Sequence, residues 1–261
     1  MRFLVSYCIE RGRNKRQCDD SALIANQVLN ETSGEIVIET PYWICLCDGV
    51  GGNAGGKEAS LFVCRELSAS RVPTGVDDTR VIFTQINTGL LQYAFNSPDQ
   101  QNMATTATAL YFSDDNVYLA HVGNTRLYSK RGPCIQQITS DQTTYQWLID
   151  HGQDEAAEAC NKSEIRGAMG GGRQDFLSPL VAQQVFERKI PATLLLTTDG
   201  VHEYASQDCI EDLLASSVSS LEKVKQICSL ALEQGSDDDR SAILVELLDD
   251  HENKELTGIH E

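Results

Sequence analysis

The sequence predicts an α+β fold: a four-layer α-β-β-α sandwich of two antiparallel β-sheets flanked by helices. The first observation is that short apolar runs of strand length come in consecutive groups near the start and in the middle of the chain. The second is that two segments with helical apolar spacing separate these groups, and two more precede a final strand. The third is the lack of regular strand–helix alternation, which disfavours a doubly wound parallel sheet.

The first third of the chain predicts strands followed by two long helices. We expect strands at Phe3–Ile9 and Ser21–Val28, the second turning through "NETSGE" to form a hairpin with Ile36–Glu39. The apolar run "YWICLC" also has strand length. Helical spacing in "KEASLFVCRELSAS" and "DTRVIFTQINTGLLQYAFN" predicts two amphipathic helices.

The remainder of the chain returns to strands and then to helices. "TTATALYF", "VYLAHVG" and "TRLYSK" are expected strands, and "ATLLLTTDGV" and "RSAILVELL" are later ones. "EDLLASSV" and "LEKVKQICSLALEQG" are expected helices. The polar region from about 141 to 175 is too long for an ordinary loop, so we expect a small insert with its own function. We predict a single domain over 1–248 and a charged, frayed tail over 249–261.

Composition excludes several classes of function. The 38 acidic residues outnumber the 21 basic ones, and the net charge of −17 argues against nucleic acid or an anionic membrane as partner. No apolar run approaches the roughly 20 residues that span a bilayer. The first basic cluster follows the first apolar run, the reverse of a secretory signal. We therefore expect a cytoplasmic protein.

Nine cysteines raise the question of zinc or disulfides. Their number is odd, and the sequence has no C-x-x-C pair. We interpret them as small buried hydrophobic residues of a reduced intracellular protein.

The glycine-rich stretch "CDGVGGNAGGKEAS" satisfies two nucleotide-binding patterns, and both fail on inspection. G-x-x-x-x-G-K ends at Lys57, but the next position needs Ser or Thr to hold magnesium and is Glu58. G-x-G-x-x-A begins at Gly49, but the acidic strand end expected about 20 residues later is replaced by a helical segment.

Aspartates at strand ends remain as the candidate functional groups. Asp48 and Asp199 each end an apolar strand and each precede a glycine. A buried ionised carboxylate is costly unless it is paired or bound to a metal ion. Two further acid clusters, "CDD" ending at Asp20 and "GSDDDRS", lie beside strands. A single Asp-Gly pair is most often a turn, but four such clusters favour a site for Mg²⁺ or Mn²⁺, which prefer oxygen ligands.

These segments resemble those of the metal-dependent type 2C protein serine/threonine phosphatases. "CDGVGGNAGGKEAS" is similar to the family's D-G-M-G-G-x-x-x-G-x-x-A-S segment, and "RNKRQCDD" to its R-x-x-N-E-D segment. "MATTATAL", "AHVGNTRLY", "LLLTTDGV" and "GSDDDRSAILV" match four more segments in the family's order. The resemblance extends from Phe3 to about Leu248.

The resemblance implies a site with two metal ions. The implied ligands are Asp20, Asp48, the backbone carbonyl of Gly49, Asp199 and Asp238. Asp48 would bridge the ions, and Asp48, Asp199 and Asp238 are the expected catalytic residues. Asp19 would hold the second ion directly or through water. The insert would correspond to the family's flap, near 161–172.

Several positions depart from the family's pattern. Lys15 stands where the family has a phosphate-binding arginine, with Arg13 and Arg16 beside it. We expect Lys15 to bind substrate with a point charge in place of a bidentate fork. Asn124 replaces an aspartate that helps hold a third ion, so we expect that ion to be weak or absent. Val50 replaces a histidine that serves some members as a candidate acid.

The resemblance implies hydrolysis of phosphoserine and phosphothreonine on proteins by water activated by two Mn²⁺ or Mg²⁺ ions. The expected partners are phosphorylated proteins and a serine/threonine kinase. A catalytically weak or inactive pseudo-phosphatase that acts as a regulatory binding module is the alternative, and a metal-dependent phosphatase for small molecules is a third. We expect His121, His202 and Arg126 to be structural, and Thr105 and Thr106 to support the site from behind.

Overall fold

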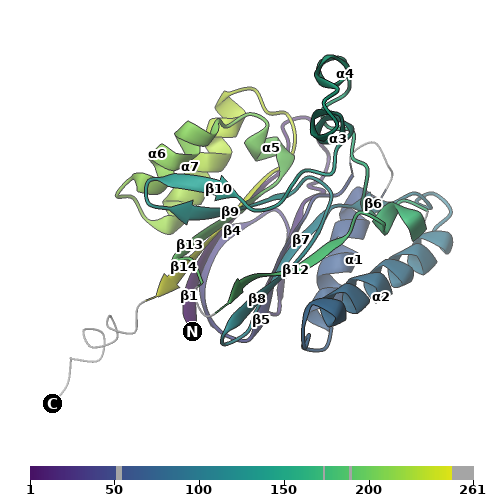
Figure 1. Ribbon diagram of the computed structural model, residues 1–261, viewed down its shortest axis with the longest axis horizontal. Helices are drawn as coiled ribbons and strands as arrows, with labels where there is room; N and C mark the ends of the chain where they lie inside the picture. Colours follow the sequence, from purple (N-terminus) through teal and green to yellow (C-terminus); the bar gives the residue numbers. More distant parts are fainter. Residues whose placement is uncertain (51–54, 173, 188–189, 249–261) are drawn as a thin grey trace.

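The computed structural model describes residues 1–50, 55–172, 174–187 and 190–248. Two six-stranded sheets face each other, and helices cover the outer face of each sheet (Figure 1). The strand pairs within these sheets are antiparallel, as in β1 with β14 and β5 with β7. The predicted four-layer α-β-β-α sandwich is therefore confirmed.

The first sheet joins the two ends of the described chain. Its strand order is β10-β9-β13-β14-β1-β4. The strands are β1 (Arg2–Glu10), β4 (Ser33–Glu39), β9 (Arg126–Arg131), β10 (Cys134–Gln137), β13 (Thr193–Thr197) and β14 (Arg240–Leu248). β1 and β14 pair along their whole lengths, with Arg2 opposite Leu248 and Glu10 opposite Arg240. Helices α6 (Gln207–Ala215) and α7 (Ser220–Glu233) cover its outer face, and the short α5 (Asp199–His202) follows β13.

The second sheet carries the other pair of long helices. Its order is β12-β8-β7-β5-β2-β3. The strands are β2 (Ser21–Ile24), β3 (Gln27–Leu29), β5 (Tyr42–Cys47), β7 (Ala107–Phe112), β8 (Asn116–Val122) and β12 (Val181–Glu187). Helices α1 (Gly56–Ser68) and α2 (Val76–Phe95) pack on it, and β6 (Ala104–Thr105) pairs with β11 (Met169–Gly170).

Three apolar layers hold the sandwich together. The central layer lies between the sheets and includes Phe3, Ile44 and Leu110. The outer layers lie under α1 and α2 and under α6 and α7. Strands β5 and β7 are buried at every position because both faces of their sheet are covered. This burial explains why their sequences read as continuous apolar runs.

The polar insert has secondary structure of its own. It contains α3 (Thr144–Asp150), α4 (Asp154–Ala159) and a 3₁₀ helix (Gln174–Leu177). Helices α3 and α4 project from the body of the sandwich (Figure 1). The Thr143 hydroxyl caps α3 by accepting a hydrogen bond from the Gln146 N–H at 3.1 Å. Met169, near the end of the insert, returns to the buried core.

Three predictions of local structure were wrong or incomplete. The run Ser21–Val28 breaks at Ala25, which has a φ of +54°, so β2 and β3 form the hairpin. β4 instead pairs with β1 in the other sheet. The run "TTATALYF" is interrupted at Thr106, which separates β6 from β7.

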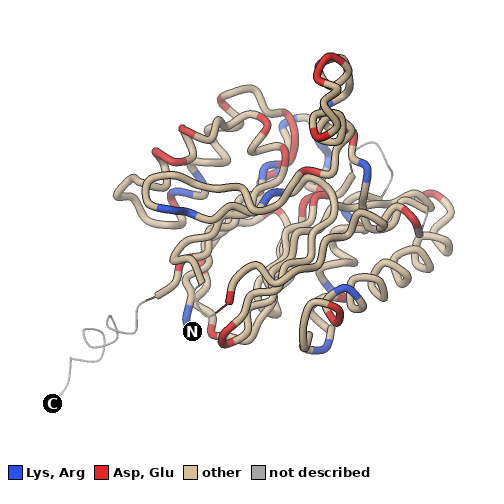
Figure 2. Tube along the Cα trace, in the orientation of Figure 1, with Lys and Arg blue, Asp and Glu red and all other residues tan. Residues whose placement is uncertain are grey.

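Some expectations concern residues that the structure does not describe. The predicted frayed tail at 249–261 and residues 51–54 of the glycine-rich stretch lie outside the described residues. Among the residues that are described, no helix combines the length and the apolar character needed to cross a membrane. Figure 2 shows acidic residues on helices and loops on both sides of the sandwich, so the negative charge is not confined to one face.

Candidate metal centre and active site

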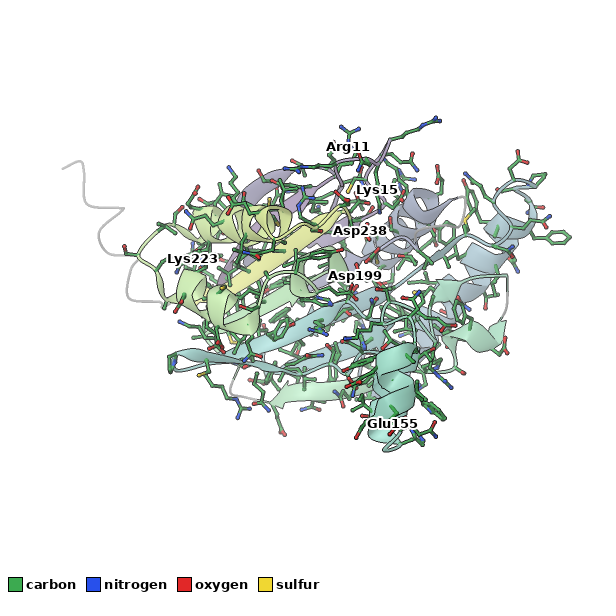
Figure 3. The ribbon with its side chains drawn as sticks, turned by 90° about the horizontal axis from the view of Figure 1, so that it is seen from above. Arg11, Lys15, Glu155, Asp199, Lys223 and Asp238 are labelled. Atoms are coloured by element: carbon green, nitrogen blue, oxygen red, sulfur yellow. The ribbon has the colours of Figure 1, made fainter. Side chains whose placement is uncertain are left out.

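Three aspartates from separate strands meet in one cavity. Asp48 follows β5, Asp199 follows β13 and begins α5, and Asp238 lies just before β14. All three line a cavity of about 160 Å³. Figure 3 shows Lys15, Asp238 and Asp199 close together near the middle of the molecule. The two Asp-Gly strand ends singled out in the sequence therefore converge in space.

The backbone of Asp48 is fixed from behind by two threonines. Its N–H donates to the Thr106 hydroxyl at 3.1 Å, and its carbonyl accepts from the Thr106 N–H at 2.9 Å. The Thr105 hydroxyl donates to the same carbonyl at 2.9 Å. The Asp48 carboxyl group is thereby left to face the cavity. The expected support from Thr105 and Thr106 is confirmed.

Burial and neighbouring carboxylates raise the pKa values of both Asp48 and Asp199. Burial raises the pKa of Asp48, and the charge of Asp199 raises it further. Burial also raises the pKa of Asp199. The Asn124 side-chain amide donates to Asp199 Oδ2 at 3.0 Å. A cation placed among these groups would relieve their repulsion.

The two carboxylate oxygens of Asp20 have different surroundings, and the difference indicates whether a cation fits beside them. Its Oδ2 accepts hydrogen bonds from the hydroxyls of Thr198 at 3.0 Å and Ser241 at 2.6 Å. Its Oδ1 is buried and has no hydrogen-bond partner among the residues that the structure describes. A buried carboxylate oxygen without a partner is costly, and a divalent cation is the ligand that would satisfy it. Burial and the charge of Asp239 raise the pKa of Asp20.

Gly49 lies where three backbone segments approach closely. Its N–H donates to the Asp19 carbonyl at 3.2 Å. A Cβ atom at Gly49 would collide with the carbonyls of Gly56 and Asp19. The glycine is therefore required by close packing of the backbone. The Asp19 carboxyl group is partly exposed and accepts from the Gln17 amide at 3.2 Å.

Lys15 lies inside the carboxylate cluster. Its ammonium contacts Asp238, Asp239 Oδ2 at 2.9 Å and Asp19 Oδ2 at 3.9 Å, and the side chain lines the same cavity. Burial lowers the pKa of Lys15, but its hydrogen bonds to Asp238 and Asp239 outweigh burial, and the pKa is raised. Arg13 and Arg16 are exposed and do not line this cavity.

Sequence reasoning did not identify Asp239. Its side chain is 1% exposed. Oδ1 accepts from the Gly12 N–H at 2.7 Å, and Oδ2 accepts from the Asp19 N–H at 2.7 Å. Together with the Lys15 contact, these bonds tie the N-terminal motif to the start of β14. The sequence "GSDDDRS" could have indicated a role for Asp239, because it has three consecutive aspartates and only one of them belongs to the implied ligand set.

The insert borders the cavity. Ser163 and Ile165 line it together with the aspartates. The Ser163 hydroxyl donates to Glu203 Oε1 at 3.1 Å, which links the insert to the residue after α5.

The other polar candidates have structural partners. Arg126 makes a bidentate pair with Asp141, with Nε–Oδ1 at 2.9 Å and Nη2–Oδ2 at 2.6 Å. His121 is held between the Thr108 hydroxyl and the Ser140 carbonyl. His202 contacts the Thr197 hydroxyl at 2.9 Å. None of these three residues lines the cavity that holds the aspartates, and their contacts agree with structural roles.

Comparison with known proteins gives consistent results. No protein-family model matches the sequence. The serine/threonine phosphatase Stp of Listeria welshimeri is 27% identical over 249 residues, which are 91% of this chain and 93% of that protein. The crystal structure of a bacterial serine phosphatase superposes with a TM-score of 0.76 at 26% identity and covers 94% of this chain and 98% of that one. The chain is thus similar, over nearly its whole length, to bacterial serine/threonine phosphatases.

Another relative differs in length from this chain. The serine/threonine protein phosphatase PstP of Mycobacterium tuberculosis is 28% identical over 213 residues, which are 79% of this chain but only 40% of that protein. This chain thus spans less than half the length of that relative. A structure of the catalytic domain of PstP in complex with two manganese ions has a TM-score of 0.74 at 23% identity and covers 95% of this chain. At that identity the likeness shows the fold.

Proposed function

We propose that this chain is a metal-dependent phosphatase that hydrolyses phosphoserine and phosphothreonine in proteins. The observation that carries the proposal is the convergence of Asp48, Asp199 and Asp238 in one small cavity. The orphaned oxygen of Asp20 adds a second acceptor that a cation would satisfy. The relatives' names support a phosphoprotein substrate for this chain.

The proposed metal ligands are those implied by the sequence: Asp20, Asp48, the Gly49 carbonyl, Asp199 and Asp238. Their all-oxygen character suits Mn²⁺ or Mg²⁺. When bound, two such ions supply a water of lowered pKa and offset negative charge on the phosphoryl oxygens. The PstP structure with two Mn²⁺ ions supports this number. A third ion is expected to be weak because Asn124 contributes no charge.

The chain's own residues then position the substrate. Lys15 presents the one cationic side chain among the described residues that line the cavity, and it is the proposed partner of the phosphate oxygens. Asp239 anchors it there. Ser163 and Ile165 border the cavity from the insert, and we propose that this flap contacts residues flanking the phosphorylated side chain.

The pseudo-phosphatase alternative has one specific observation in its favour. The Lys15 ammonium is engaged by Asp238 and Asp239, and in this arrangement it competes with a metal ion for Asp238. A regulatory binding module would retain the fold without turnover.

The deciding experiment measures hydrolysis of p-nitrophenyl phosphate and of phosphopeptides by the purified chain with Mn²⁺, with Mg²⁺ and after chelation. Asp48→Asn should abolish turnover, because it removes a charged ligand from the site. Asp237→Asn is the matched control, since Asp237 is exposed in the same acidic run. If neither Mn²⁺ nor Mg²⁺ supports turnover, the binding module is favoured. If phosphometabolites are hydrolysed faster than phosphopeptides, a small-molecule phosphatase is favoured. The proposal also includes a cytoplasmic location and a partner serine/threonine kinase, which cellular experiments can test.

A further inference from the structure

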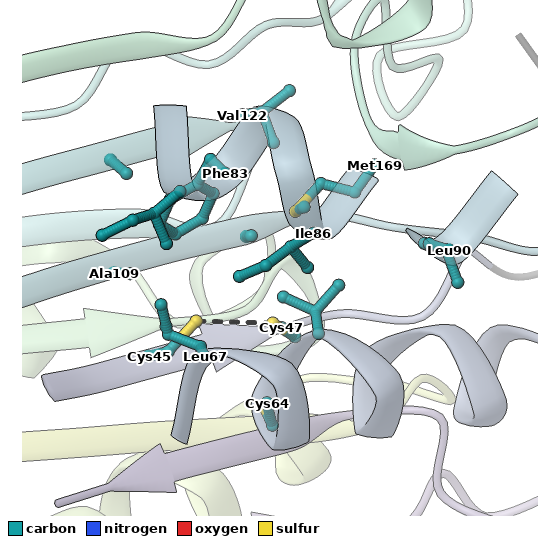
Figure 4. Packing of buried hydrophobic residues seen from close by; sticks show 14 of the residues in the cluster. Cys45, Cys47, Cys64, Leu67, Phe83, Ile86, Leu90, Ala109, Val122 and Met169 are labelled. Atoms are coloured by element: carbon teal, nitrogen blue, oxygen red, sulfur yellow. Dashed lines mark hydrogen bonds between the residues drawn. The ribbon is translucent and has the colours of Figure 1, made fainter. Parts of the chain in front are cut away.

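Three cysteines gather in the core between β5 and α1 (Figure 4). Cys45 and Cys47 alternate along β5 and so point to the same face of the sheet. Cys64 faces them from α1. The three sulfur atoms all lie within 4.8 Å of one another, and the Cys45 and Cys47 sulfurs are 3.5 Å apart. Each of the three residues is 0% exposed.

This spacing is close to that of a three-coordinate sulfur site. Three atoms no more than 4.8 Å apart all lie within about 2.8 Å of a common point, and metal–thiolate bonds are about 2.3 Å. A contraction of about 0.5 Å per sulfur would therefore bring all three into bonding distance. Helix α1 and strand β5 already hold the ligands from opposite sides, so little backbone ordering is needed.

The surroundings restrict the kind of ion that fits. The neighbouring side chains of this core layer are apolar, among them Val63, Leu67 and Phe83. Among the residues that the structure describes, the group of metal-ligating side chains here contains sulfur alone. Thiolates select soft ions, and three ligands fall short of the four that structural zinc uses.

Charge balance selects among the soft ions. An uncompensated charge in an apolar interior costs several kcal/mol. Three thiolates around a monovalent ion leave two negative charges, and around a divalent ion they leave one. Only a trivalent ion makes the cluster neutral, and Arg65, the cationic neighbour of Cys64 in α1, is exposed.

We propose that Cys45, Cys47 and Cys64 bind one trivalent thiophilic ion of the arsenic(III) class. Arsenous acid supplies the ion: its three hydroxyl groups leave as water with the three thiol protons, and three arsenic–sulfur bonds form. No atom is oxidised or reduced. The bound ion would cross-link α1 to β5 at the residue preceding Asp48. The site is distinct from the carboxylate centre, whose oxygen ligands suit hard ions.

The test uses the full chain in its reduced form, equilibrated with sodium arsenite. Arsenic per chain is measured after gel filtration, and X-ray absorption counts the atoms bound to arsenic. We expect one tightly bound arsenic per chain with three sulfur neighbours and no oxygen neighbour. Cys134 and Cys209 are exposed and could compete for the ion. Oxygen in the arsenic shell, or a count of two sulfurs, would show that such exposed thiols capture it and would overturn the proposal.

Variants locate the site. Cys64→Ala should weaken binding at least tenfold, because loss even of an outer-shell partner costs about 10–100-fold in metal affinity. Cys228→Ala is the matched control: Cys228 is equally buried but lies on α7, where its sulfur contacts the carbonyls of Cys8 and Arg240. Equal binding by both variants would refute the assignment. If Cys64→Ala does not fold, the sulfur count on the unmodified chain still decides, and tighter binding of Cu⁺ or Zn²⁺ than of arsenic would refute the choice of ion.

Discussion

Removal of the Asp239 carboxylate should destabilise the fold more than any other change to the acidic run before β14. The side chain accepts two backbone N–H groups, from Gly12 and Asp19, each at 2.7 Å, and it pairs with the Lys15 ammonium at 2.9 Å. In Asp239→Ala these donors lose their acceptor in a region shielded from water. The N-terminal motif would also lose its attachment to β14.

The expected magnitude follows from the burial of Asp239. Hydrogen bonds to charged groups contribute about 1.5–3 kcal/mol each, and removing one partner of a buried ion pair costs about 3–5 kcal/mol. These contributions are not additive, so we expect Asp239→Ala to lower the free energy of unfolding by about 3–5 kcal/mol. Asp239→Asn retains one acceptor oxygen and should cost about half as much.

Urea unfolding of the metal-free chain, in chelator at neutral pH, measures this change through the transition midpoint at constant slope. Asp237→Ala is the control, because Asp237 is exposed, and it should stay within about 0.5 kcal/mol of the unmodified chain. If Asp239→Ala also stays within that range, the anchoring role assigned to Asp239 is wrong.

Three further predictions concern the site and its supports. Asn124→Asp replaces the amide that donates to Asp199 at 3.0 Å by a like charge. Calorimetry should show tighter binding of a third Mn²⁺, and urea unfolding in chelator should show that the free energy of unfolding falls by about 1–3 kcal/mol. Unchanged Mn²⁺ binding would count against this role of Asn124. Mn²⁺ should raise the melting temperature of the unmodified chain, and it should raise the melting temperature of Asp48→Asn much less. Equal shifts in the two proteins would show that the ion binds elsewhere. Burial lowers the pKa of His121 from 6.5 to about 4, so the unfolded chain binds the proton first as the pH falls. The contribution of His121 to stability is therefore present above pH 6.5, and the free energy of unfolding should decrease by about 2 kcal/mol between pH 7.5 and pH 5. His121→Gln should lack this part of the decrease.

The sequence was sufficient for the layers but not for all strand partners. Continuous apolar runs in β5 and β13 and helical spacing in α1 and α2 reported burial directly, because burial determines which side chains are tolerated. The partner of β4 could not be read in the same way. Its alternating pattern suits any half-covered sheet, and the positive φ of Ala25, which creates the β2–β3 turn, leaves no mark in a non-glycine residue.

The site was predictable where chemistry demands a residue type and unpredictable where packing decides. Asp48 and Asp199 were recognisable because a carboxylate at the end of an apolar strand has few explanations. Asp239 was not, because its role depends on backbone N–H groups of Gly12 and Asp19, more than 200 positions away in the chain. The thiol cluster was also hidden, since Cys64 joins the β5 cysteines only when α1 packs on the sheet.

The pairing of β1 with β14 has a consequence for the order of folding. β14 lies between β13 and β1. In the part of the chain that the structure describes, no strand pairing joins the β10-β9-β13 half of the first sheet to the β1-β4 half until Arg240–Leu248 is in place. A chain emerging from the ribosome can complete the second sheet with α1 and α2 much earlier, because its last strand ends at Glu187. Contacts between distant segments form slowly. The first sheet, and with it the position of Asp238 beside Asp48 and Asp199, is therefore assembled last, after synthesis of residue 248.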